Sequence, residues 1–200
     1  MLDADARFSI VEHLTVWKPG TGAYWEGESK MTNPVDFDRL IRRAHELGAV
    51  EAKPIDPRSV VTAAWVRLKC QFGCPHYNTR LCCPPYTPTA EQFEKVLACY
   101  TRAFLFHSRG MDVSPGDIAF ELEQELFFRG FYRAIGLGAG PCRLCKTCHL
   151  EQCLHPLQAR PAMEACSIDV YATVRANGYA IEVVRDRTET PNRYGLILIE

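Results

Sequence analysis

The sequence lacks several features that would assign it to a common class. No apolar run approaches the roughly 18 residues that a membrane-spanning helix requires. Net charge is almost absent, since 23 Lys and Arg against 24 Asp and Glu leave −1, so no overall field favours nucleic acid or an anionic membrane. Hydrophobic residues make up 47% and charged residues 24%, which excludes wholesale disorder and fibrous repeats. We therefore expect a globular protein with neither a nucleic-acid nor a membrane partner.

Motifs of hydrolases and nucleotide-binding proteins are also missing. We find no Ser-His-Asp arrangement, HExxH helix, paired-carboxylate signature or nucleophile elbow. The glycines at 136, 138 and 140 match neither the G-x-G-x-x-G spacing nor the P-loop ending. They are expected instead to let backbone N–H groups approach the sulfurs of a metal centre.

The N-terminal residues do not resemble a secretory signal. Residues 1–12 carry three acids and one base, and no apolar stretch follows them. We therefore expect a reducing cytoplasm, where disulfides are rare. The ten cysteines of this chain are then expected to serve mainly as metal ligands.

The length and the mixture of element types predict the fold class. A chain of 200 residues and 22.6 kDa corresponds to one domain. Helical and strand-like segments mix without strict alternation, which favours an α+β fold with four to six strands and three or four helices. Residues 1–30 show no sustained period and are expected to form a weakly ordered arm or an extended start. Residues 31–200 would form the metal-binding domain.

Hydrophobic periodicity and turn residues predict the individual elements. Thr89 is expected to cap a helix, Thr32 or Asn33 to cap the first one, and Phe127 to face the core. The expected helices cover 34–47, 89–100, 116–130 and 161–177, the expected strands cover 49–55, 60–68, 103–107, 179–184 and 194–199, and cysteine-rich loops cover 70–88 and 136–155.

The second cysteine-rich loop carries the stronger motif. It reads Cys142-x-x-Cys145-x-x-Cys148-x4-Cys153, followed by Pro156. Three thiolates at successive spacings of three can hold three corners of one cubane, as in the bacterial ferredoxin run for a [4Fe–4S] cluster. The match is imperfect, because one extra residue precedes Cys153 and Pro156 lies three positions beyond it.

The first loop supplies a second set of ligands. It contains Cys70-x3-Cys74 and then the pair Cys82 and Cys83, followed by two prolines. Adjacent cysteines rarely ligate one metal together, so we favour Cys83, which precedes proline as in the ferredoxin motif. Cys82 and Cys99 are then expected to be small buried hydrophobes, and Cys166 is the eighth candidate ligand.

Eight cysteines leave room for two [4Fe–4S] clusters. The expected ligands are Cys142, Cys145 and Cys148 for one cluster and Cys70, Cys74 and Cys83 for the other, with Cys153 and Cys166 completing the sets. Such a protein would pass single electrons to or from a redox partner protein. Two alternatives are a cluster enzyme with an open iron site and a structural zinc module completed by His76, His149 or His155. Glu164 is the one acid expected near the metal.

Five segments resemble a family of cysteine-rich, predicted metal-binding proteins of anaerobic bacteria and archaea. The segments are Val66–Cys70, Cys74–Tyr77, Cys83–Thr89, Gly140–Cys145 and Arg160–Val170. The resemblance implies iron–sulfur binding and no defined reaction. Asn78 and Ser167 stand where the family is associated with glycine, so the turn geometry there is expected to differ.

Overall fold

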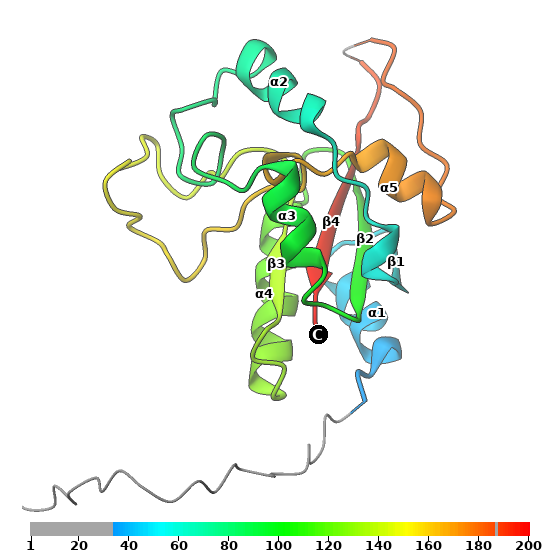
Figure 1. Cartoon of the computed structure of the whole chain (residues 1–200). Helices are drawn as coiled ribbons and strands as arrows, with labels where there is room; N and C mark the ends of the chain where they lie inside the picture. Colours follow the sequence, from blue (N-terminus) through cyan, green and yellow to red (C-terminus); the bar gives the residue numbers. More distant parts are fainter. Residues whose placement is uncertain (1–33, 187) are drawn as a thin grey trace, which may run out of the picture. The chain divides into compact units, whose positions relative to one another are not determined.

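The computed structural model describes residues 34–186 and 188–200 (Figure 1), so the arm expected over residues 1–30 lies outside the described residues. The elements, in chain order, are α1 (Phe37–Glu46), β1 (Glu51–Ile55), η1 (Pro57–Ser59), α2 (Ala64–Gly73), α3 (Ala90–Leu97), β2 (Ala103–Arg109), α4 (Pro115–Phe128), β3 (Ile135–Leu137), η2 (Glu164–Cys166), α5 (Val170–Ala176) and β4 (Asn192–Leu198). None of these described helices is long and apolar enough to cross a membrane.

A four-stranded antiparallel sheet in the order β1-β2-β4-β3 forms the centre of the fold. The two central strands pair along their whole length, with Ala103 opposite Leu198 and Arg109 opposite Asn192. Strand β3 is short and pairs only with the end of β4. The predicted α+β class and the strand number are confirmed, whereas the described residues form five α-helices, one more than expected.

Alternation along β2 divides the core between the two faces of the sheet. Phe104 and Phe106 face α1 and α4 and pack on Leu40 and Leu122. Leu105 belongs to the opposite face, which α3, η2 and α5 cover with side chains such as Phe93, Leu97, Met163 and Val174. Figure 1 shows these helices on the two sides of the sheet.

Two predicted strands are not present in the described residues. Residues 60–68 make one isolated bridge, Thr62 to Ile168, and then enter α2. A short apolar run does not distinguish a strand from a helix, and here only Val66 of α2 is buried. Residues 179–184 form no ladder, although Tyr179 and Ile181 pack in the core.

Three helix predictions are corrected in detail. The first helix begins after Asp36, whose carboxylate accepts the N–H of Arg39 at 2.9 Å, and not after Thr32 or Asn33. The helix expected over 161–177 is divided into η2 and α5, because Ser167 takes a left-handed φ of 65°. Phe127 is 54% exposed, since one helical step from the buried Leu126 turns it away from the sheet.

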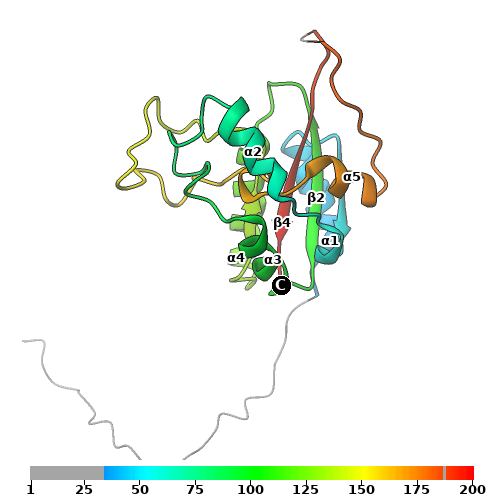
Figure 2. The ribbon, with the colours of Figure 1, turned by 45° about the horizontal axis from the view of Figure 1, so that its top comes forward.

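Both cysteine-rich segments lie beside the sheet at the end where β3 leads into Gly138. Figures 1 and 2 agree that the loop after α2 and the long segment after β3 run side by side there. A parallel bridge between Gly138 and Ala162 closes the long segment at its base. The fold therefore brings cysteines separated by about 70 residues of chain into one region.

Candidate metal centre

Helix α2 positions the first two cysteines. Cys70 lies in its last turn and Cys74 directly follows it in an extended conformation, and both cysteines line one cavity. Arg67 fixes this helix against the loop after Cys83, because its guanidinium donates to the carbonyls of Thr87 and Pro88, each at 3.0 Å.

A tight turn brings the chain back to Cys83. The N–H of Cys83 donates to the carbonyl of Arg80 at 3.0 Å, and the N–H of Asn78 donates to the carbonyl of Pro84 at 2.8 Å. Asn78 adopts a φ of 55°, the left-handed conformation that glycine favours and that asparagine tolerates. Asn78 and Ser167 therefore both adopt the left-handed turn conformation that glycine favours. The altered turn geometry that we expected at these two positions is not seen.

Hydrogen bonds then fix this loop to η2. The buried hydroxyl of Thr87 donates to the carbonyl of Ala165 at 2.5 Å, and that of Ser167 donates to the carbonyl of Pro88 at 3.2 Å. The N–H of Ala63, just before α2, donates to the carbonyl of Ser167 at 2.8 Å. Helix α2, the loop and η2 thus surround one space.

We name this space the first site. It is a cavity of about 200 Å³ lined by Cys70, Cys74, Cys83 and Glu164, and also by His76, Tyr77, Pro84, Gly140, Pro141, Ala162 and Ala165. Burial raises the pKa of the Cys83 thiol to about 11, and the nearby Cys74 and Cys70 add to this effect. Burial, Cys74 and Glu164 also raise the pKa of Cys70. The three thiols and the carboxyl group therefore line one cavity and influence one another electrostatically.

Glu164 differs from the other polar groups at the first site. Its Oε2 is fully buried and has no hydrogen-bond partner among the described residues. Burial raises the pKa of this carboxyl group. A buried acceptor without a partner is costly, so the protein fold leaves the hydrogen bonding of this carboxyl group incomplete.

The second site gathers five cysteines around a narrow cavity of about 20 Å³. They are Cys82, Cys142, Cys145, Cys148 and Cys153, and the imidazoles of His149 and His155 also line the cavity. Burial raises the pKa of Cys82 to about 12, and the neighbouring Cys142, Cys153 and Cys83 raise it further. The sequence motif from Cys142 to Cys153 is thus brought together, and Cys82, which we expected to be inert, joins it.

The two sites adjoin each other. Cys82 and Cys83 are consecutive, yet Cys82 lines the second site and Cys83 the first. Arg80 connects the two loops, because its guanidinium donates to the carbonyl of Cys145 at 3.2 Å and to Nδ1 of His76 at 3.4 Å. Cys82 and Cys83 can therefore both be ligands without sharing one metal, because each lines a different site.

The remaining two cysteines lie apart from these sites. Cys166 is 1% exposed and packs in the core with Met163 and Ile168. Burial raises the pKa of its thiol to about 12. Cys99 is exposed at the end of α3, so its expected burial is wrong. In residues 34–186 and 188–200, no three His, Cys, Asp or Glu side chains converge closely enough to hold one metal ion.

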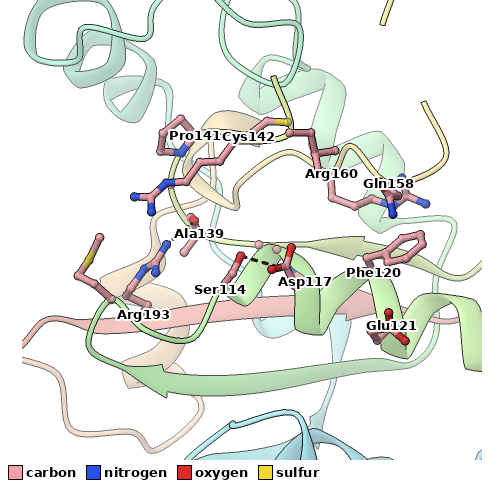
Figure 3. Close-up of a pocket in the computed structure, with 16 residues that line it drawn as sticks. Ser114, Asp117, Phe120, Glu121, Ala139, Pro141, Cys142, Gln158, Arg160 and Arg193 are labelled. Atoms are coloured by element: carbon pink, nitrogen blue, oxygen red, sulfur yellow. Dashed lines mark hydrogen bonds between the residues drawn. The ribbon is translucent and has the colours of Figure 1, made fainter. Parts of the chain in front are cut away.

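A larger cavity of about 340 Å³ opens on the other side of Cys142. It is bounded by the start of α4, where the hydroxyl of Ser114 accepts the N–H of Asp117, and by Arg193, Arg160 and Gln158 (Figure 3). The N–H of Gly136 donates to Glu123 at 2.7 Å and the N–H of Gly138 donates to the carbonyl of Pro161 at 2.9 Å, so neither donates to a cysteine sulfur. Instead Gly138 packs on α4, where an added Cβ would lie 2.6 Å from Cα of Gly116.

A buried ion pair holds the far end of the second loop. Arg160 donates two hydrogen bonds to Glu123 of α4, and each side chain is only 13% exposed. Glu123 also accepts the N–H of Gly136 at 2.7 Å. The pair therefore joins α4, β3 and the segment that precedes η2.

Comparison with known proteins identifies the family. A model described as "Predicted metal-binding protein (DUF2284)" matches residues 53–199, which include both sites. The chain therefore belongs to this family of predicted metal-binding proteins, as its cysteine motifs indicated. No curated protein and no solved structure matches the chain.

Proposed function

We propose that this member of the metal-binding family holds two [4Fe–4S] clusters, one at each site, and transfers single electrons to or from a partner protein. The observation that carries the proposal is the division of eight cysteines into two adjoining sets that share the Cys82–Cys83 pair. One set contains three cysteines and Glu164, and the other contains five cysteines.

The donor atoms favour iron–sulfur chemistry. Thiolates are soft ligands that suit iron–sulfur clusters and zinc. The first site, at about 200 Å³, exceeds many-fold the roughly 10–15 Å³ of cavity volume that one water molecule needs, so it has room for more than a single ion. The second site, at about 20 Å³, has room for about one water molecule, so the spacing of its cysteines and not its volume supports a cluster there. The Cys142-x-x-Cys145-x-x-Cys148 triplet at the second site has the ferredoxin spacing.

The close approach of the two sites favours electron transfer. Arg80 contacts both loops, and Pro141 and Cys142 line the first and the second site in turn. Neighbouring clusters pass electrons readily because transfer becomes faster at short range. Because the described residues show no organic-cofactor motif, we propose that the electrons pass to or from a redox partner protein.

One observation favours a second candidate function, a cluster-dependent enzyme. The 340 Å³ cavity in Figure 3 falls within the usual size of small-molecule sites and includes Cys142 in its lining. A substrate bound there would lie next to the second site. Under this alternative the cluster at that site would act on the substrate directly.

Metal and sulfide analysis of protein purified without oxygen tests the proposal. We expect about eight irons and eight acid-labile sulfides per chain, and an absorption band near about 400 nm that bleaches on reduction. Cys74→Ser and Cys145→Ser should each remove about half of the iron, whereas Cys99→Ser should remove none. One or two zinc ions with no sulfide would refute the proposal and favour a structural zinc module.

A further inference from the structure

The first site provides only three cysteines. Cys70, Cys74 and Cys83 line it, whereas a cubane with one protein ligand on each iron needs four. The sequence suggested Cys166 as a completing ligand, but Cys166 packs in the core with Met163 and Ile168 and does not line the cavity. The remaining polar side chains of the lining are therefore the candidates for the fourth position.

Three such side chains line the first site: His76, Tyr77 and Glu164. His76 already has Arg80 as a hydrogen-bond partner through Nδ1, and it is part of a turn at the surface. Glu164, in contrast, lines the site with a carboxyl group whose buried Oε2 has no hydrogen-bond partner among the described residues. It also lies close enough to Cys70 for the two to interact electrostatically.

Resting on the proposed function, we infer that Glu164 is the fourth ligand of the cluster at the first site, so that three thiolates and one carboxylate hold it. The carboxylate supplies an oxygen donor, which is harder than a thiolate and binds iron of a cluster less tightly. The iron at that corner is consequently the one that this site releases most easily.

A neighbouring cavity shares part of its lining with the first site. It has a volume of about 270 Å³, shares Cys70, Cys74 and Glu164 with the first site, and is also lined by Trp65 and Tyr171. A small ligand with a sulfur, nitrogen or oxygen donor could therefore replace Glu164 on that iron. The second site, with five cysteines, offers no comparable carboxylate in its lining.

Mild oxidation with ferricyanide tests the inference on the full chain loaded with clusters. Glu164 would release its iron as Fe²⁺ while one electron passes to ferricyanide, so a cluster of charge 2+ becomes a three-iron cluster of charge 1+. We expect the wild type to fall from about eight to about seven irons per chain, with a new electron paramagnetic resonance signal of a three-iron cluster. Sulfide should stay at about eight.

Variants at this position separate the ligand role from a structural one. Glu164→Cys should keep all its iron after ferricyanide treatment, because a fourth thiolate replaces the carboxylate. Glu164→Gln should hold about seven irons before any oxidation. The matched control is Glu182→Gln, which removes an exposed carboxylate outside both sites and should behave as the wild type.

The outcomes distinguish this inference from the proposed function. A wild type with about eight irons that loses none on oxidation, or a Glu164→Cys variant that loses iron as readily as the wild type, would overturn the inference and leave two clusters in place. A wild type without iron and sulfide would refute the proposed function itself. If Glu164→Gln fails to fold, the comparison of the wild type with Glu164→Cys still decides the question.

Discussion

The buried pair of Arg160 and Glu123 should contribute more to stability than any exposed ion pair among the residues that the structure describes. Both side chains are 13% exposed, and Glu123 also accepts the N–H of Gly136. Removing one member of such a pair leaves a buried charge without a partner, which costs about 3–5 kcal/mol. Glu123→Gln and Arg160→Met should therefore each lower the free energy of unfolding by about that amount.

For a chain of this length, about 1 kcal/mol corresponds to a shift of roughly 2–4 °C in Tm, so each variant should lose about 6–20 °C. The double variant should lose less than the sum of the two, because it leaves no unpaired charge. Urea unfolding of protein purified without oxygen provides the free energies, and thermal unfolding provides Tm.

The matched control is the more exposed pair of Arg43 and Glu125, whose side chains are 33% and 27% exposed. Glu125→Gln should cost at most about 1 kcal/mol, as surface pairs do. If Glu123→Gln costs no more than Glu125→Gln, the pair does not anchor the second loop and the reasoning from burial is refuted.

Three further predictions concern the cysteines and the packing of the glycine segment. Cys82→Ser should lower the iron content of the second site while Cys99→Ser leaves it unchanged, as measured by iron analysis; equal content in both would place Cys82 outside the metal centre. Burial raises the pKa of the Cys166 thiol from an ordinary 9.0 to about 12, so above about pH 9 this thiol ionises in the unfolded chain before it does in the folded one, and stability falls as pH rises. Cys166→Ala should make this fall in the free energy of unfolding shallower, as measured by urea unfolding. An unchanged slope would contradict the prediction. Gly138→Ala should cost about 1–3 kcal/mol in the same assay because its Cβ would meet backbone at 2.6 Å, whereas Gly73→Ala, with open space around it, should be neutral or stabilising; similar effects would refute the close packing.

Local signals predicted the elements that local interactions determine. Thr89 and Gln92 form a reciprocal capping box at the start of α3, so the sequence alone located that helix. The buried strand β2 was predictable from its short apolar run. Residues 60–68 were not, because their backbone conformation depends on the pairing of Thr62 with Ile168 more than 100 residues away.

At the candidate site, too, a local motif was predictable from the sequence, whereas features that depend on tertiary contacts were not. The spacing of Cys142, Cys145 and Cys148 is a local motif, and these residues do gather at one cavity. The role of Cys82 was missed because neighbouring side chains in a loop can point to different cavities, and only the tertiary arrangement shows which. The partnerless Oε2 of Glu164 is likewise invisible in sequence, since burial follows from η2 packing below the cysteine loop.

Native mass spectrometry of the anaerobically purified wild-type chain is the most direct test of the two-cluster account. The account predicts a mass equal to the polypeptide plus two four-iron, four-sulfide units, with Cys74→Ser and Cys145→Ser each losing a different one of them. A mass equal to the polypeptide plus one or two zinc ions, without sulfide, would contradict it.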